Sequence, residues 1–405
     1  MAEENGTHTP KTNPPRKKKK KTPGQKIVLI LLIAVLVAAV VLLAVVGVSV
    51  WQVLDGGNDR PPADLSVFDT TPVGLRDKVA YYVFGLEGAD KEAPFDALAL
   101  ICHDKENGSV QVLQIPVSTY IGKDHPVETV GQVWNNPKPL LWCENCRTDV
   151  PEDNKTVDGD KIRCGRCGEI VTERIGSSQG DLMSIFNDQM GMPVDQYFIM
   201  PHEGFKELVN TIHGIDVTLD TKWKVGDVTY PAGVNTLDGA TALQYITTYE
   251  YKGTPESDIA RIVRSRKVFA ALVEKVCALE SSKLYSILEG TDTYKMFGLQ
   301  TGKNAIRTGN GSAAEDIRQI VDIFAAFKTI SPENKVFYLL PGETAKVGTL
   351  SCYSMHRTDL AALLQETFNP YGEPVTESDL GLTELGSGKA SDTKRATFAE
   401  CLPQV

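Results

Sequence analysis

The stretch from Ile27 to Val50 reads IVLILLIAVLVAAVVLLAVVGVSV and contains no charged residue. At a helical rise of about 1.5 Å per residue, it is long enough to cross a hydrocarbon core about 30 Å thick. We therefore predict one membrane-spanning helix. The alternative is a cleaved signal peptide, whose apolar core would be shorter and would end at a small-residue cleavage site.

Charge is distributed unevenly on the two sides of this segment. Residues 1–26 contain eight Lys and Arg against two Asp and Glu, and they include the run Lys17 to Lys21. By the positive-inside rule, the N-terminus is predicted to be cytoplasmic and the main domain extracytoplasmic, in a single-pass protein of the cell membrane. The lysine run is explained by this topology alone, or it adds affinity for an anionic inner leaflet.

The rest of the chain is acidic. It contains 34 of the 42 Lys and Arg and 50 of the 52 Asp and Glu, which leaves a net charge of −16 after residue 26. Such a charge argues against nucleic acid as a partner. About 340 residues follow the apolar run, enough for one large domain or two small ones.

Strand and helix patterns alternate beyond the apolar run. Asn107-Gly108 separates two strand patterns and predicts a hairpin. The order of elements predicts an α/β fold, an α-β-α sandwich around a central mixed sheet. Strands are predicted at 78–85, 95–103, 110–115, 197–200, 215–219 and 336–340. Helices are predicted at 177–190, 203–212, 240–245, 257–279, 314–330 and 358–368.

The most specific spacing in the chain is formed by cysteines. Two Cys-x2-Cys pairs, Cys143 with Cys146 and Cys164 with Cys167, are separated by seventeen residues. Each pair on a tight turn can supply two thiolates to a tetrahedral Zn²⁺, which predicts a zinc ribbon at 142–170. The polar segment between the pairs could not build a core of its own, so the metal would be structural.

Disulfide formation is the alternative for these four cysteines, because an extracytoplasmic location permits it. We expect a ribbon outside the membrane, with basic residues scattered among acids, to contact a protein partner and not nucleic acid. Cys102 and Cys277 lie in apolar patterns and are predicted to be small buried hydrophobes.

Several segments resemble a known family in their order along the chain. The segments are Val83-Phe-Gly-Leu-Glu87, Phe95-Asp-Ala-Leu-Ala-Leu100, Gln114-Ile-Pro-Val-Ser-Thr-Tyr-Ile121, 204–217, 232–245 and Asp258-Ile-Ala-Arg-Ile-Val-Arg-Ser265. In this order they resemble the LytR-CpsA-Psr (LCP) family of cell-wall glycopolymer transferases, over residues 77–370 with the ribbon as an insertion.

The expected organisation follows from these patterns. From Thr376 onward, Ser, Gly, Thr and Lys dominate without periodicity, which predicts a disordered tail. The expected parts are a basic cytoplasmic tail 1–26, a transmembrane helix 27–50, a linker 51–76, the LCP-like domain 77–370 with its insertion 142–170, and the tail 371–405.

The resemblance implies a pocket for a polyprenyl pyrophosphate. In such proteins arginines neutralise the pyrophosphate, an acidic pair holds Mg²⁺, and a glycan of the teichoic acid or capsule type passes from the lipid carrier to peptidoglycan. Cations would stabilise the charge that develops on the leaving group. An apolar tunnel would accept the prenyl tail.

Four residues match the family's functional positions. The resemblance implies that Asp96 is a catalytic Mg²⁺ ligand and that Arg261 is catalytic and binds pyrophosphate, together with Asp258 and Arg264. At about 100° per residue, Asp258, Arg261 and Ser265 share a helix face away from the apolar stripe. A surface ion pair three residues apart is the alternative for Asp258 and Arg261.

The family's pattern is incomplete here. Val117 and Ser118 replace an Arg-Asp pair, Thr247 and Tyr249 replace two arginines, and Ser265 replaces a glutamine. A pyrophosphate with little compensation in a partly dehydrated pocket costs several kcal/mol.

Arg266 is a candidate substitute for the absent arginines, because it falls inside the apolar stripe, where a charge needs a partner. Alternatively, its stem merely passes the edge of the core. The five histidines beyond residue 100 show no ligand spacing, and no role is predicted for His103, His125, His202, His213 or His356.

Two functions follow as hypotheses. The first is an envelope protein that binds polyprenyl-pyrophosphate-linked glycopolymers and acts as a Mg²⁺-dependent transferase toward peptidoglycan. The second is a catalytically degenerate scaffold or sensor of the envelope that acts through its zinc ribbon. A membrane-bound transcriptional regulator is disfavoured, because the cytoplasmic tail is too short to fold.

Overall fold

The computed structural model describes a large part of the chain beyond residue 74. The described residues are 75, 77–88, 95–122, 125, 127–136, 140–150, 154–159, 161–174, 178–251, 256–289, 313–385 and 392–404. The predicted cytoplasmic tail, the membrane span and the linker, apart from residue 75, lie outside them. Within these ranges, no helix combines the length and apolar character needed to cross a membrane. The chain divides into residues 1–59 and 60–405, and all described residues belong to the second unit.

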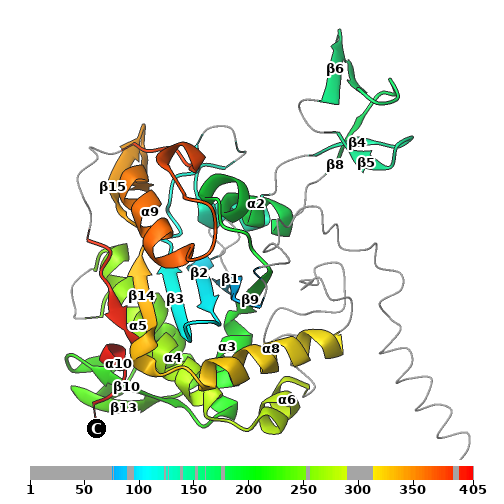
Figure 1. Cartoon of the computed structure of the whole chain (residues 1–405). Helices are drawn as coiled ribbons and strands as arrows, with labels where there is room; N and C mark the ends of the chain where they lie inside the picture. The colour runs from blue at the N-terminus through cyan, green and yellow to red at the C-terminus, as the bar shows by residue number, and fades with distance from the viewer. Residues whose placement is uncertain are drawn as a thin grey trace, which may run out of the picture. The chain divides into compact units, whose positions relative to one another are not determined.

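A six-stranded mixed sheet forms the centre of this unit, in the order β17-β14-β3-β2-β1-β9 (Figure 1). Neighbouring strands are antiparallel except for β1 with β9 and β3 with β14, which are parallel. The mixed sheet predicted from the sequence is therefore present. The strands are β1 (Val79–Glu87), β2 (Phe95–Asp104), β3 (Ser109–Gln114), β9 (Gln196–Pro201), β14 (Lys335–Leu339) and β17 (Ala396–Thr397).

The turn between β2 and β3 confirms the predicted hairpin. Asp104 accepts hydrogen bonds from the backbone N–H of Asn107 at 2.9 Å and from its side-chain amide at 2.8 Å. Gly108 has a φ of +61°, a conformation that glycine adopts without a steric penalty. This local chemistry sets the register that pairs Ala99 with Gln114 at the other end of the hairpin.

Helices cover both faces of the sheet. Successive side chains of a strand point to opposite faces, so each strand contacts both helical layers. Tyr81 and Val83 pack toward α2 (Ser178–Met190), α9 (Arg357–Leu363) and the π-helical turn η5 (Leu364–Phe368). Tyr82 and Phe84 pack toward the opposite layer. That layer contains α3 (His202–Thr211), α4 (Gly239–Thr247), α5 (Asp258–Cys277), α6 (Ser281–Glu289), α8 (Ala313–Lys328) and α10 (Phe398–Cys401). The structure thus has the predicted α-β-α layers (Figure 1).

Smaller elements complete the described residues. Two-stranded sheets pair β10 (Ile215–Leu219) with β13 (Gly233–Leu237), β11 (Trp223–Val225) with β12 (Val228–Tyr230), and β15 (Gly342–Val347) with β16 (Leu350–Met355). The 3-10 helices are η2 (Val130–Asn135), η4 (Pro332–Asn334) and η6 (Glu377–Asp379). The cysteine-rich insertion contains β4 (Leu140–Cys143), β5 (Thr148–Asp149), β6 (Lys155–Asp158), β7 (Lys161–Cys164) and β8 (Thr172–Arg174).

Residues 371–385 and 392–404 take a defined conformation, which corrects the disordered tail predicted from residue 371 for these residues. Strand β17 pairs antiparallel with β14 and extends the central sheet. The ring of Phe398 stacks on that of Phe337, with centroids 4.4 Å apart and planes inclined by 14°. The prediction failed because these elements are too short to show periodicity, and they are stabilised by contacts with residues far away in the sequence.

A buried ion pair connects α5 to the sheet. The ammonium group of Lys335, whose side chain is 1% exposed, lies 2.5 Å from Glu274 Oε1. A buried charge is stable only with its partner in place. We therefore expect the two members to respond differently to substitution.

Replacing Glu274 with Gln should lower the free energy of unfolding by about 1–3 kcal/mol, because it leaves a buried ammonium group without its countercharge. Replacing Lys335 with Met should cost less, since the carboxylate can reach solvent. Chemical denaturation of both single variants and of the double variant measures the coupling between them. Equal costs for the two single changes would contradict this account.

Candidate functional site

The side chains of Glu87, Asp96 and His202 lie at one edge of the sheet, where β1 and β9 end and β2 begins. Asp96 Oδ2 lies 2.7 Å from Nε2 of His202, the first residue of α3. Glu87 Oε1 accepts a hydrogen bond of 3.1 Å from the indole of Trp134. Gly88 packs against this group, since a Cβ there would lie 2.7 Å from Asp96 Oδ2.

The carboxyl of Glu87 differs from an ordinary surface carboxyl. Burial raises its pKa, and the Trp134 hydrogen bond and the nearby imidazole of His202 lower it in part. Glu87 therefore holds its proton more tightly than usual while a positive charge is absent, and a bound cation would favour its ionised form.

Arg261 connects this edge to two helices. Its guanidinium donates from Nη1 to the carbonyl of Asp96 at 3.0 Å and to that of Ile246 at 3.1 Å. Nη2 and Nε donate to Asp258 Oδ1 at 2.7 and 3.2 Å. Burial acts to lower the pKa of Arg261, but Asp258, Tyr249 and Asp96 raise it overall, so the group is charged.

The structure thus brings together Asp96, Asp258 and Arg261, which are far apart in the sequence. Arg261 is 1% exposed, so its ion pair with Asp258 is not the surface pair that was the alternative reading. Its contact with Asp96 is made to the backbone carbonyl, which leaves the Asp96 carboxylate to His202.

Arg264 and Arg266 lie elsewhere, and none of their described contacts involves Asp96. Arg264 donates to Glu256 Oε2 at 2.9 Å, to the carbonyl of Thr248 at 2.6 Å and to that of Tyr245. Arg266 donates to Gln114 Oε1 at 2.5 Å and to the carbonyl of Lys394. Both arginines are buried and hold internal contacts in this structure.

The polar face predicted for α5 is only partly correct. Arg261, Ser265 and Arg266 are each no more than 2% exposed, so the first half of the helix is buried on several sides. The apolar stripe alone could not reveal this, because α4, β2 and β3 supply polar acceptors to these side chains.

The residues at the positions where the sequence departs from the family's pattern take structural roles. The ring centroid of Tyr249 lies 5.0 Å from the Arg261 guanidinium carbon, and its hydroxyl lies 3.3 Å from Asp258. Thr247 donates to the carbonyl of Leu243, and Ser265 to that of Ile262. Of the substituted pair, Val117 packs against the core and Ser118 accepts a backbone hydrogen bond from Tyr353.

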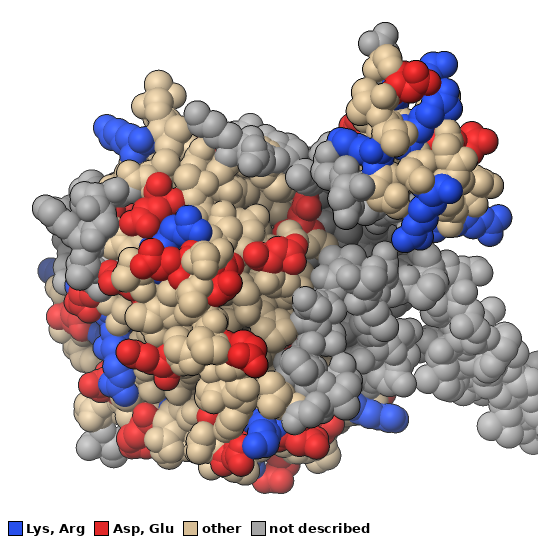
Figure 2. Space-filling view, turned by 45° about the horizontal axis from the view of Figure 1, so that its top comes forward, with Lys and Arg blue, Asp and Glu red and all other residues tan. Residues whose placement is uncertain are grey.

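Acidic groups predominate at the sheet edge. Among the described residues, the carboxyls of Glu87, Asp96 and Asp258 share this edge with one permanently charged cation, Arg261, and with the imidazole of His202. An anionic ligand at this edge would therefore meet net repulsion unless a further cation came with it. Acidic side chains are also prominent on the face shown in Figure 2.

The donor atoms suit a magnesium ion in one respect. Mg²⁺ in phosphoryl-transfer sites binds through one or two carboxylates and takes its other ligands from phosphate and water. Asp96 and Glu87 could supply those carboxylates. Among the described residues, however, the single group of three or more His, Cys, Asp or Glu close enough to enclose an ion is formed by the four cysteines.

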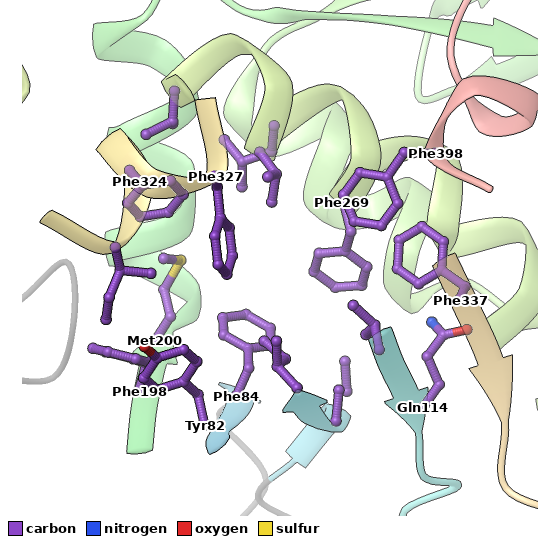
Figure 3. A pocket seen from close by; sticks show the side chains of 18 of the residues that line it. Tyr82, Phe84, Gln114, Phe198, Met200, Phe269, Phe324, Phe327, Phe337 and Phe398 are labelled. Carbon is purple, nitrogen blue, oxygen red and sulfur yellow. The ribbon is translucent and has the colours of Figure 1, made fainter. Parts of the chain in front are cut away.

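An apolar cavity of about 140 Å³ lies between the sheet and the layer of α5 and α8 (Figure 3). Its lining includes Ala97 and Leu98, which directly follow Asp96, and Met200, which precedes His202 by two residues. A cavity of about 150 Å³ can hold benzene. The space therefore accepts a short apolar segment, and a longer chain would require the lining side chains to move.

The four cysteines of the insertion converge as their spacing predicts. Their sulfur atoms all lie within 4.8 Å of one another. Arg147 and Gly168, each just after a Cys-x2-Cys pair, have φ values of +52° and +75°, as tight turns require. Each turn directs two sulfur atoms toward the same point, and the backbone N–H of Cys146 lies 3.4 Å from Cys143 Sγ.

The insertion has a small core of its own. Cys143, Cys164, Val150 and Val171 are buried together. So few apolar side chains could not offset the entropy of ordering the segment, which leaves a need for a metal or cross-links. The other four cysteines are buried and unpaired, in agreement with the prediction for Cys102 and Cys277.

Sequence reasoning missed two members of the sheet edge, Glu87 and His202. Glu87 stood at the family's Gly-x-Asp position, and its conservative change from Asp was a signal. His202 directly follows a strand and opens a helix, which is where side chains gather at a sheet edge. Neither pattern reveals the 2.7 Å contact with Asp96, because the two residues are 106 positions apart.

Comparison with known proteins finds a family model that matches part of the chain. Residues 178–369 match the model described as the LytR_cpsA_psr family. This segment contains α2, β9, α3, α4 and α5, and hence His202, Asp258 and Arg261. The resemblance seen in the sequence is therefore supported at family level for this segment.

Several curated proteins are similar to parts of the chain. The cell wall biosynthesis protein LcpA of Corynebacterium glutamicum is 25% identical over 191 residues, which cover 47% of this chain and 34% of LcpA. The polyisoprenyl-teichoic acid–peptidoglycan teichoic acid transferase TagU of Enterococcus faecalis is 32% identical over 103 residues, which cover 25% of this chain and 33% of TagU. The chain thus spans about a third of the length of these relatives.

Solved structures show a weaker likeness. Crystal structures of TagV from Bacillus subtilis and of TagT bound to LIIa-WTA align with TM-scores of 0.49 and 0.47 and identities of 16% and 17%. The alignments cover 76% and 78% of this chain and 99% and 96% of those chains. At these scores, the description of the fold rests on the strand order and layers given above.

Arg261 should matter for stability as well as for any chemistry. Its replacement by Met should lower the free energy of unfolding by about 3 kcal/mol or more, because it leaves the Asp96 and Ile246 carbonyls and the Asp258 carboxylate without their donor. The matched control is Lys267→Met on the same helix, whose pair with the half-exposed Asp220 should contribute under about 1 kcal/mol. Similar losses in urea denaturation would refute the bridging role.

Proposed function

We propose that this chain is a divergent LCP-type protein of the cell envelope that binds a polyprenyl-pyrophosphate-linked glycopolymer and transfers the glycan to peptidoglycan. One observation carries the proposal. Ala97 and Leu98, which line the apolar cavity, directly follow Asp96, whose carboxylate contacts His202 and whose carbonyl accepts from Arg261. A lipid whose tail is apolar and whose head is anionic requires these two environments side by side.

The lipid tail would occupy the cavity. The lining is almost wholly aliphatic and aromatic, and it includes Phe84, Phe198 and Met200 close to the polar edge. Burial of apolar chain contributes about 25 cal/mol per Å², so a few isoprene units would supply substantial affinity. Aromatic side chains of α8, such as Phe324 and Phe327, would have to move to admit a longer chain.

The pyrophosphate would lie at the sheet edge, with Mg²⁺ between it and the carboxylates. Asp96, assisted by Glu87, would hold the ion, which when bound would neutralise charge on the phosphate oxygens. His202 fixes the orientation of the Asp96 carboxylate. Arg261 holds the Asp96 carbonyl in place and adds positive charge to the edge.

The substrate class is inferred from the relatives. Proteins named TagU are described as transferring teichoic acid from a polyisoprenyl carrier to peptidoglycan. A teichoic acid or capsule-type polymer is therefore the expected glycan here. The predicted span at 27–50 would hold the chain in the cell membrane as a single-pass protein, with its main domain extracytoplasmic and close to lipid carriers.

Binding should depend strongly on Mg²⁺, because the described residues of the edge carry no surplus of cations. With the purified full-length chain, retention of a polyprenyl-pyrophosphate-linked glycan should fall at least tenfold without Mg²⁺ or in Asp96→Asn. The control is Asp216→Asn, an exposed carboxylate on β10. The proposal fails if no lipid is retained with Mg²⁺ present and no glycan reaches peptidoglycan.

We further propose that the four cysteines of the insertion bind one structural Zn²⁺. The convergence of four sulfur atoms on two tight turns supports this assignment. All four positions would be filled by protein ligands, so the ion would stabilise the fold and not meet substrate. Disulfides remain the competing state, because Cys143 Sγ lies 3.4 Å from Cys167 Sγ and Cys146 Sγ 3.9 Å from Cys164 Sγ.

Metal analysis distinguishes zinc from disulfides. The chain purified under reducing conditions should contain about one zinc per molecule, and Cys164→Ser should lose most of it. Cys352→Ser is the control, since Cys352 is buried outside the insertion. A metal-free chain that contains two disulfides after purification without reductant would show that the sulfur atoms cross-link instead.

The second function is an envelope scaffold or sensor that acts through the ribbon and a protein partner. Two observations favour it: the donors of Arg261 already have protein acceptors, and Tyr249 occupies a position where the family has an arginine.

This second function predicts a distinct genetic result. Arg261→Ala would leave the cellular phenotype of the wild type, provided that the variant protein accumulates, whereas Cys164→Ser would reproduce the deletion. Immunoblotting controls for protein level, since Arg261 also supports the fold. The opposite pattern, with Cys164→Ser silent, would rule out the scaffold.

A further inference from the structure

Tyr249 is the single aromatic residue among the large apolar side chains that are exposed in the described part of the chain. It is 48% exposed, and the other exposed members are aliphatic. Its ring centroid lies 5.0 Å from the guanidinium carbon of Arg261, and its hydroxyl donates to Asp258 Oδ1 at 3.3 Å. Its carbonyl accepts from the backbone N–H of Glu256 at 2.6 Å. These three contacts hold an exposed ring in one position.

The Asp258 carboxylate has one oxygen left for a ligand. Its described hydrogen bonds come from the Tyr249 hydroxyl and from Nε and Nη2 of Arg261, and all three reach Oδ1. None of these contacts involves Oδ2, and the side chain is 26% exposed. A carboxylate accepts hydrogen bonds at both oxygens. Because the Tyr249 hydroxyl contacts the same carboxylate, the exposed ring and Oδ2 lie side by side.

This pair of groups borders the Asp96 edge. Nη1 of Arg261 donates to the carbonyl of Asp96 at 3.0 Å, and the same guanidinium lies against the Tyr249 ring. A single guanidinium group therefore separates Tyr249 from the start of β2. A chemical group that is bonded to a ligand at Asp96 can reach the Tyr249 ring.

The chemistry of the pair suits a neutral sugar. The described carboxyls of Asp96, Asp258 and Glu87 repel a further anion, whereas a neutral hydroxyl can donate a charge-assisted hydrogen bond to Oδ2. An aromatic ring has a negative face, which attracts the polarised C–H bonds on the face of a pyranose. An exposed ring beside an available carboxylate oxygen provides both contacts at once.

We propose that Tyr249 and Asp258 form a subsite for one neutral pyranose, the sugar that is bonded directly to the lipid pyrophosphate. The sugar packs on the part of the Tyr249 ring that Arg261 leaves uncovered, and one of its hydroxyls donates to Asp258 Oδ2. The place of this sugar in the reaction rests on the proposed function, but its binding does not require a lipid. Asp258 would then recognise hydroxyl groups, and not the pyrophosphate that the sequence resemblance assigned to it.

Soluble sugars test the subsite without lipid. Methyl β-glucopyranoside and its N-acetylglucosamine counterpart are titrated into the full-length chain in detergent, and saturation-transfer NMR reports binding. At least one of the two should bind about fivefold or more tightly than methyl β-glucuronide, which has the same ring and a negative charge. Tyr249→Leu should weaken this binding about fivefold, and Tyr249→Phe, which keeps the ring, should stay within about twofold of the wild type. Glu250→Gln, an exposed change at the next position, is the matched control.

Two outcomes would overturn the subsite. One is the absence of binding by both neutral sugars, and the other is equal binding by the wild-type chain and Tyr249→Leu. The Tyr249→Leu variant should fold, since Arg261 keeps its ion pair and its two carbonyl acceptors, and the unfolding temperature checks this.

A second comparison separates the subsite from the proposed function. Dimethylallyl pyrophosphate, with one isoprene unit, is compared in the presence of Mg²⁺ with the same molecule carrying one glucose. The sugar should raise affinity about fivefold in the wild type, and Tyr249→Leu should abolish this gain without changing the binding of the sugar-free probe. If neither probe binds while a soluble sugar does, the proposed function fails and the subsite stands. If both probes bind equally well, the subsite fails and lipid binding stands.

Discussion

The burial of Arg261 is the constraint on which the sheet edge depends. Its guanidinium joins the first residues of β2, the last turn of α4 and the start of α5, through the carbonyls of Asp96 and Ile246 and the carboxylate of Asp258. These contacts set the position of Asp96 relative to α5. Because a guanidinium has five donors in a planar fork, it can hold three elements at once where a lysine could not.

The same contacts limit what the edge can do. Donors committed to protein carbonyls do not neutralise a ligand as free arginines would, and Glu87, Asp96 and Asp258 add negative charge. Among the described residues, this edge therefore offers little positive charge to an anionic ligand. By contrast, the apolar cavity does not depend on a cation, because aromatic and aliphatic side chains of the sheet and of the α5 and α8 layer line it.

The two faces of the central sheet differ in how tightly the helices pack against them. The face toward α2 and α9 is a packed core, and the face toward α5 and α8 leaves an open space beneath aromatic rings. Two buried guanidinium groups of α5 differ in their partners: Arg261 pairs with Asp258, whereas Arg266 donates to neutral acceptors and has no carboxylate partner among the described residues.

The order of elements was predictable because each depends on local pattern. The β2–β3 hairpin followed from Asn107-Gly108, the long helix α5 from its apolar stripe, and the cysteine cluster from two Cys-x2-Cys spacings. Contacts between distant segments were not predictable. His202 on Asp96, Tyr249 on Arg261 and the docking of Phe398 on Phe337 all join residues whose neighbours in the sequence show no common signal.

By itself, the sequence determined the α/β class, the convergence of the four cysteines and the set of arginines available to α5, since these depend on residue types and their spacing. Only the tertiary structure decided which partner each arginine has. The acceptors around α5 come from the sheet and from α4, and their positions depend on how these elements pack. The charge of a site follows from that assignment and not from the list of its residues.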